Sequence, residues 1–166
     1  MPTGNWAPRQ CRNGAPHLLP ARPRPRVPRA NQGVVSIAGD FSIRNNGTAG
    51  RDLSGGIVAA SGSVVSLNTG AAGSVTGNVG PGLLVTHNST ARLQRAVLTG
   101  NQGEGVRAAA LSSVLLFAPN IVTGNAGYDL VCTPNSYGSG NPTGVGRMFC
   151  PAFGQLLSLP GGPGER

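Results

Sequence analysis

The sequence predicts an all-β protein whose short parallel strands wind into a coil, a β-helix or solenoid of about three to four rungs with disordered termini. Three observations support this fold class. A Thr-Gly-Asn triplet recurs at a nearly constant spacing, apolar residues take the same places in each repeat, and glycine is abundant at 27 of 166 residues. Only 4% of the residues are aromatic and 11% are charged. This composition suits many tight turns and excludes a disordered polyelectrolyte.

The triplet marks the period of the repeat. It ends at Asn78, Asn101 and Asn125, so its asparagines lie 23 and 24 residues apart. A coil with this period places similar side chains directly above one another, and stacked amides can then form a hydrogen-bonded ladder. We expect such a ladder from these three asparagines. The glycine before each of them would supply the backbone freedom that a sharp corner needs.

An earlier copy of the repeat lies upstream. Residues 42–46 match residues 74–78 in pattern but precede them by 32 residues. This distance exceeds one period by about nine residues, and we expect the excess as an insertion at Gly47–Gly55. Long loops between rungs commonly carry function.

Apolar residues test this alignment, because side chains alternate between the two sides of a strand. Five positions are apolar in every copy that aligns, which an accidental match does not explain. The five columns are Ile57, Leu83, Val106, Leu130; Ala59, Val85, Ala108, Cys132; Val65, Ala91, Val114; Leu67, Leu93, Leu116; and Ile43, Val75, Leu98, Val122. These side chains are predicted to form the core.

The repeat and its columns resemble the right-handed parallel β-helix repeat family, the pectate-lyase-like superfamily, over roughly residues 33–132. The resemblance implies a right-handed parallel β-helix and a short or fragmentary member of that family. Enzymes of the family typically act on acidic polysaccharides, in a cleft on the outer face of the first stack of strands with clustered Asp or Arg. Because this fold hosts many functions, the resemblance specifies the fold rather than the activity.

The outward residues match such a cleft poorly. The first outward column is Val58, Leu84, Arg107 and Val131, in which only Arg107 could contact a uronate carboxylate. Glycoside hydrolysis needs two paired carboxylates and a calcium site needs several, whereas the four acidic residues between positions 31 and 130 are scattered. We therefore assign no catalytic residue, no metal ligand and no cofactor. Calcium is expected only if the chain is lyase-like.

Four residues are candidates for ligand binding: Arg51, Asp52, Arg107 and His87. Arg51 and Asp52 lie at the centre of the insertion, where the alternative is a solvated turn with a local ion pair. His87 directly follows a predicted strand and could act as a general base or a ligand, the alternative being an exposed turn histidine. Residues 88–90, Asn-Ser-Thr, fit the acceptor pattern for N-glycosylation.

Three cysteines are too few for a disulfide framework and do not have the spacing of a metal site. Cys132 ends the last recognisable strand, and Cys150 follows a Gly/Pro/Ser-rich loop 18 residues later. A disulfide between them would tie this loop across the end of the stack and would imply an oxidising compartment. The alternative is two unpaired thiols, with Cys132 filling an inward column. Cys11 would be left over.

Composition divides the chain into three segments. Residues 1–31 hold seven prolines and six of the 13 arginines without any acidic residue, and we predict that they are disordered. Residues 32–132 form the predicted β-helix, and residues 133–166 a cap or loop followed by a flexible tail. The net charge of +8 is therefore mostly a property of the N-terminal segment. The sequence contains no apolar run of about 18 residues that predicts a membrane span, and no secretory signal pattern.

Three functions are compatible with these features, given in order of preference. The first is a non-catalytic extracellular or cell-surface β-helix module that binds a glycan or serves as an adhesive or structural surface. The second is a fragment of a polysaccharide lyase or glycoside hydrolase whose active rungs are missing. The third, nucleic-acid binding through the arginine-rich arm, would show affinity that falls steeply with salt. Whether the chain is an enzyme stays open at this point.

Overall fold

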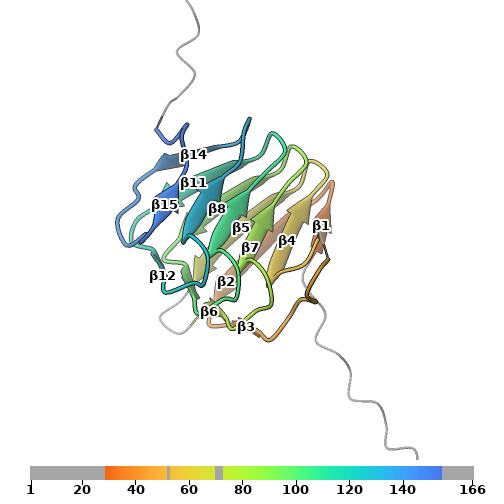
Figure 1. Cartoon of the computed structure of the whole chain (residues 1–166), viewed down its shortest axis with the longest axis vertical. Helices are drawn as coiled ribbons and strands as arrows, with labels where there is room; N and C mark the ends of the chain where they lie inside the picture. Colours follow the sequence, from red (N-terminus) through yellow and green to blue (C-terminus); the bar gives the residue numbers. More distant parts are fainter. Residues whose placement is uncertain (1–28, 52, 70–72, 155–166) are drawn as a thin grey trace, which may run out of the picture.

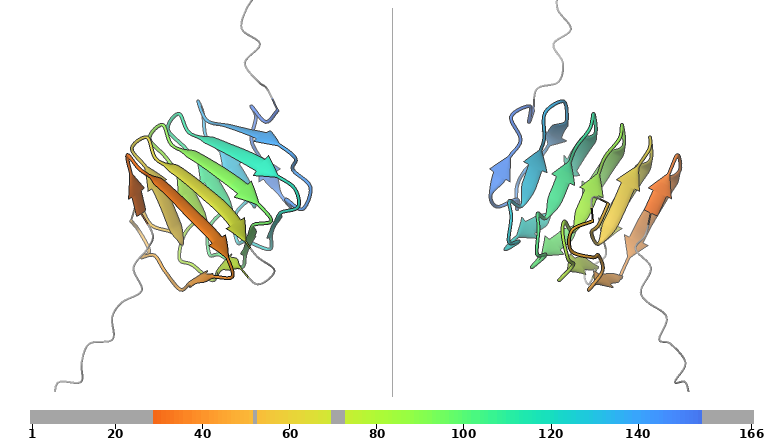
Figure 2. Two further views of the ribbon diagram at one scale, coloured as in Figure 1. Left: turned by 180° about the vertical axis from the view of Figure 1, so that it is seen from behind. Right: turned by 45° about the vertical axis from the view of Figure 1, so that its right-hand side comes forward.

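The computed structural model describes residues 29–51, 53–69 and 73–154. Within these ranges every regular element is a β-strand, and the strands pair in parallel to form three sheets around one core (Figure 1). The predicted all-β class is thereby confirmed, and the protein is a parallel β-solenoid whose rungs stack along one axis (Figure 2). Of the disordered segment predicted at residues 1–31, residues 1–28 lie outside the described residues, and so do residues 155–166 of the predicted C-terminal cap and tail.

Each sheet takes one strand from successive rungs. Sheet A contains β1 (Arg29–Asn31), β4 (Ile57–Ala60), β7 (Leu83–Val85), β10 (Val106–Ala108), β13 (Leu130–Cys132) and β15 (Met148–Phe149). Sheet B contains β2 (Val34–Gly39), β5 (Val64–Thr69), β8 (Thr90–Gln94), β11 (Ser113–Phe117) and β14 (Tyr137–Gly140). Sheet C contains β3 (Ser42–Arg44), β6 (Ser74–Thr76), β9 (Val97–Thr99) and β12 (Ile121–Thr123).

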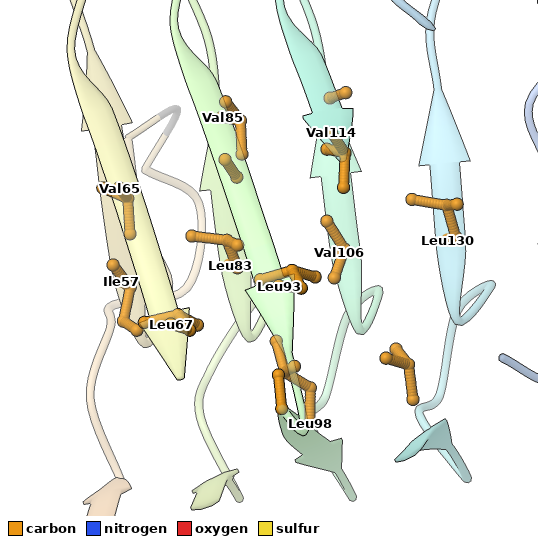
Figure 3. Packing of buried hydrophobic residues seen from close by; sticks show 14 of the residues in the cluster. Ile57, Val65, Leu67, Leu83, Val85, Leu93, Leu98, Val106, Val114 and Leu130 are labelled. Atoms are coloured by element: carbon orange, nitrogen blue, oxygen red, sulfur yellow. The ribbon is translucent and has the colours of Figure 1, made fainter. Parts of the chain in front are cut away.

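The predicted apolar columns are in register. Leu83 pairs with Ile57 on one side and with Val106 on the other, and Val106 pairs with Leu130. These four side chains are at most 1% exposed, and they follow one another from rung to rung inside the coil (Figure 3). The other four columns lie in the same core, with Ile43 partly buried at its N-terminal end. The alternation of side chains along each strand therefore places the residues as the sequence pattern predicts.

The coil extends beyond both boundaries that the triplet predicts. At its N-terminal end β1 and β2 pair with β4 and β5, so the first rung begins at Arg29 rather than at residue 32. At the other end β14 pairs with β11, a bridge joins Val145 to Val122, and β15 pairs with β13. Residues 133–149 therefore continue the coil, although they had been expected to form only a cap or loop.

The repeat between residues 42 and 74 is about nine residues longer than the next one, and these extra residues fall in two places rather than one. The link between β3 and β4 takes twelve residues, 45–56, against six, 77–82, for the link between β6 and β7. Six extra residues therefore belong to the predicted insertion, Gly47–Gly55. The other three lie in and after β5. From the start of β5 to the start of β6 the chain takes ten residues, 64–73, whereas the same part of the next rung, from β8 to β9, takes seven, 90–96.

The asparagines form the predicted ladder. In each step the backbone N–H and the side-chain Nδ2 of one asparagine both donate to Oδ1 of the next. The two distances are 3.1 and 2.9 Å from Asn78 to Asn101, and 3.0 and 2.8 Å from Asn101 to Asn125. Asn46 joins Asn78 in the same way, at 3.0 and 3.3 Å. The corners before the three triplet asparagines have the expected positive φ: 63° at Gly77, 63° at Gly100 and 69° at Gly124.

A second ladder, made of serines, runs along the corner between sheets A and B. The N–H of Ser63 donates to Oγ of Ser89 at 3.1 Å, Ser89 donates to Ser112 at 3.1 Å, and Ser112 donates to Ser136 at 3.2 Å. All four serines are buried. This ladder was not predicted from the sequence, because serine is also a common residue of exposed turns.

The C-terminal end of the core is closed by two features. The disulfide predicted between Cys132 and Cys150 is present, with Cα atoms 4.5 Å apart. Gly138 occupies the inward position in β14 that Val114 holds in β11. A Cβ at Gly138 would lie 2.7 Å from Cδ2 of Phe153, so the missing side chain leaves room for that ring. Cys150 and Phe153 both pack against the core and cover its end.

Candidate functional site

The segment between β3 and β4 builds a groove on the outer face of sheet A. Its start packs against the link between β6 and β7, where Val79 N–H donates to the Asn46 carbonyl at 2.7 Å. Gly47 has a φ of 96°, and the Val79 carbonyl leaves no room for a Cβ there. Thr48 N–H donates to Ser54 Oγ at 2.6 Å and closes the segment on itself. Figure 2 shows this segment lying outside sheet A near the lower end of β4.

The outer face of sheet A is apolar beside this segment. Val58, Ala60 and Leu84 point away from the main core, yet they are at most 5% exposed and form a small cluster of their own. Leu84 belongs to the lining of the groove, together with Leu53 of the insertion. The outward aliphatic residues are therefore covered at β4 and β7, and the face opens to solvent further along the coil, at β10.

The structure brings three of the four candidate residues together. The groove has a volume of about 540 Å³, and Arg51, His87 and Arg107 all line it. Arg51 comes from the insertion, His87 from the corner after β7, and Arg107 from β10. The sequence indicates these residues as separate candidates and does not predict their convergence. Asp52 lies outside the described residues.

The groove is cationic. Arg51 and Arg107 line it, and none of its described lining residues is acidic. Among the described residues, Arg107 forms an ion pair with Glu104, whose Oε1 lies 3.7 Å from Nη1 of Arg107. The side chain of Arg107 is 44% exposed and that of Glu104 is 22% exposed. Solvent therefore screens this ion pair, and it contributes little to stability. Arg107 can therefore exchange Glu104 for a ligand at small cost.

Hydroxyl groups flank the two arginines. Thr86 and Thr48 line the groove, and Thr86 Oγ1 lies 3.1 Å from Nδ1 of His87. His87 is exposed and has a φ of 55°. The contact with Thr86 orients the imidazole beside the groove. Neither threonine was predicted as a site residue, since threonine is an ordinary residue of loops and of the turns that follow strands.

The remaining polar candidates have structural or peripheral positions. Asn78, Asn101 and Asn125 are buried in the ladder and do not reach the groove. Asn88 of the glycosylation pattern is exposed at the corner after β7, whereas Ser89 is buried in the serine ladder. In the described part of the chain, no group of three or more His, Cys, Asp or Glu side chains could hold a metal ion. Nor does this part contain a helix long and apolar enough to cross a membrane.

Fold and groove together define a class: a parallel β-solenoid with a cationic groove on the outer face of one sheet. Comparisons of the chain with protein families, with curated proteins and with solved structures find no match.

Proposed function

We propose that the protein is a non-catalytic extracellular module that binds glycans, and that the groove on sheet A takes an acidic sugar. The observation that carries this proposal is the convergence of Arg51, His87 and Arg107 on one groove whose described lining contains no carboxylate. The resemblance of the repeat to the pectate-lyase-like superfamily supports a polysaccharide as the ligand.

The chemistry of the groove suits a uronate unit. A guanidinium group donates two parallel hydrogen bonds to a carboxylate, a geometry that gives both strength and orientation. The exposed hydroxyl of Thr48 can exchange hydrogen bonds with sugar hydroxyls, and Leu53, which is 41% exposed, offers an apolar surface to ring C–H groups. The volume of about 540 Å³ lies within the usual range for sites of small ligands.

The disulfide supports an extracellular location. Cytosolic thiols are kept reduced by glutathione and thioredoxin, whereas disulfides persist in secreted proteins. The Cys132–Cys150 bond also lies at the end of the solenoid, where it holds the last strands in place. A secreted module of this kind would meet its polysaccharide outside the cell.

Calorimetric titration of the full chain with tetragalacturonate and with its methyl ester tests the proposal. We expect the acid to bind more tightly than the ester, because only the acid can form charge-assisted hydrogen bonds with the arginines. Arg107→Ala should lower the affinity for the acid about tenfold or more, the loss expected for one such bond. Arg92→Ala is the matched control, since Arg92 is exposed on β8 of sheet B. It should leave the affinity unchanged.

Three results would contradict the proposal. Equal affinity for the acid and the ester, or full affinity in Arg107→Ala, would exclude the groove as a uronate site. Release of unsaturated sugar products from polygalacturonate, with or without calcium, would overturn the non-catalytic assignment.

A further inference from the structure

An exposed aromatic pair lies at the C-terminal end of the outer face of sheet A. Tyr128 is 48% exposed and Phe149 is 53% exposed, and their ring centroids are 5.9 Å apart with an interplanar angle of 36°. Single exposed apolar residues are normal, but contiguous exposed apolar patches mark interaction sites.

The aromatic pair continues the face that carries the groove. Arg107 pairs with Val131, and Val131 pairs with Phe149, so Phe149 stands in the same outward column two strands from Arg107. Two steps between neighbouring strands span roughly 10 Å. This distance is comparable with the length of a disaccharide.

Tyr128 continues the neighbouring column. The carbonyl of Tyr128 accepts a hydrogen bond from Gly105, just as the carbonyl of Glu104 accepts one from Gly82 one rung earlier. Tyr128 therefore occupies the position next to Glu104 along the coil, and its ring pairs with that of Phe149, two strands beyond Arg107. A ligand that leaves the groove past Arg107 would meet these rings next.

Both aromatic residues are attached to rigid parts of the fold. Phe149 is followed by Cys150 of the disulfide, and Tyr128 is followed by Asp129, whose carboxylate accepts hydrogen bonds from Asn125 and Arg147. Rings held in this way lose little conformational entropy on binding, which is why rigid aromatic side chains are effective anchors.

We infer that Tyr128 and Phe149 form a second subsite, where they stack on the apolar face of a sugar ring further along the same bound chain. This inference rests on the proposed function and extends its ligand from a single acidic sugar to an oligosaccharide that lies across the rungs. The amphipathic tyrosine ring can contact sugar C–H groups while its hydroxyl stays in water. Continuity with the arginine groove favours a sugar over a protein partner.

Chain length of the ligand provides the test on the full protein. Digalacturonate can occupy the groove alone, whereas hexagalacturonate can also reach the aromatic pair. We expect Tyr128→Ala and Phe149→Ala each to lower the affinity for the hexamer about tenfold and to leave the affinity for the dimer unchanged. The same two substitutions should lower the affinity for the methyl-esterified hexamer by the same factor, because stacking needs no charge.

Three further measurements are matched to these variants. Phe117→Ala removes an aromatic residue that is equally exposed, at 50%, from the outer face of sheet B, and it should bind the hexamer like the parent protein. Tyr128→Phe should restore hexamer binding because it keeps the ring. Thermal unfolding followed by circular dichroism confirms that each variant is folded.

The outcomes separate the inference from the proposed function. If Arg107→Ala weakens binding of the hexamer while the aromatic variants bind it normally, the second subsite is excluded and the groove stands. If the parent protein binds neither the dimer nor the hexamer, both are excluded. If sedimentation shows that the parent protein is a dimer and that Phe149→Ala is a monomer, the aromatic pair is a protein interface, and this would also overturn the inference.

Discussion

Asp129 ends the asparagine ladder at Asn125. Its Oδ1 accepts hydrogen bonds from the backbone N–H and from Nδ2 of Asn125, at 3.2 and 2.9 Å, and its Oδ2 accepts the N–H of Arg147 at 2.8 Å. Every asparagine of the ladder donates toward the C-terminal end, so Asn125 needs an acceptor beyond it, and the N–H of Arg147 needs a second acceptor at the same place. An ionised carboxylate supplies both acceptors, and the ladder therefore has a direction that Asp129 closes.

Replacing this carboxylate by an amide should destabilise the fold. In Asp129→Asn the remaining oxygen can still accept from Asn125, but the new amide would then face the N–H of Arg147, and two donors would meet. Residue 129 is only 3% exposed, so water cannot relieve the mismatch. We expect the free energy of unfolding to fall by about 1–3 kcal/mol, measured by urea denaturation.

Glu104→Gln is the control for this prediction. It removes the same charge, but from an exposed ion pair with Arg107 at 3.7 Å, and it should change the free energy of unfolding by about 0.5 kcal/mol or less. An Asp129→Asn protein as stable as its parent would show that the direction of the ladder does not need an acceptor at its end.

The Gly138–Phe153 contact predicts a coupled pair of substitutions. By the repeat alone, position 138 should carry an aliphatic residue like Val114, with which it is aligned. A Cβ there would lie 2.7 Å from the Phe153 ring, so Gly138→Val should displace that ring and lower stability by about 1–3 kcal/mol. Urea denaturation of the full chain measures this loss.

A double-mutant cycle isolates the contact. In a Phe153→Ala background the contact with the ring is gone, and Cys150 Sγ, 3.1 Å from the Cβ position, is the remaining close neighbour. Gly138→Val should therefore cost less there than in the parent protein. An equal cost in both backgrounds would mean that valine is disfavoured at position 138 for a reason other than the ring.

The core and the asparagine ladder could be predicted from the sequence because a solenoid repeats by translation. Leu83, Val106 and Leu130 occupy equivalent places in successive periods, so their burial follows from spacing and strand alternation alone. The ends of the coil break this rule. β2 is not marked by the triplet, and β14 has Gly138 at its inward position, so neither strand stood out.

The groove could be predicted only in its parts. Arg107 has an outward position by strand alternation, but the insertion that carries Arg51 follows no period. Its path over sheet A depends on contacts such as Val79 N–H with the Asn46 carbonyl, which no local pattern encodes. His87 was found as a candidate and its groove was not, for the same reason.

The disulfide should contribute measurably to stability. It closes a loop with a sequence separation of 18 residues between Cys132 and Cys150, and the chain-entropy relation gives about 3 kcal/mol for a loop of this size. We expect urea denaturation with and without a thiol reductant to differ by about this amount. Alkylation of the unfolded, unreduced protein should label Cys11 alone, and labelling of Cys132 or Cys150 would contradict the pairing.

The corner after β10 should tolerate a stabilising substitution. Ala110 and Leu111 have positive φ values of 50° and 63°, and Leu111 is 65% exposed. The position of Leu111 is taken by Gly62 in the corner after β4 and by Asn88 in the corner after β7. Glycine and asparagine adopt the left-handed region with the least strain. Leu111→Gly and Leu111→Asn should therefore each raise the free energy of unfolding by about 0.5–1 kcal/mol, measured by thermal and urea denaturation. Leu111→Ala shortens the exposed side chain but keeps the Cβ that causes the strain, so it should give no such gain. An equal gain from alanine would attribute the effect to the lost apolar surface instead of the backbone.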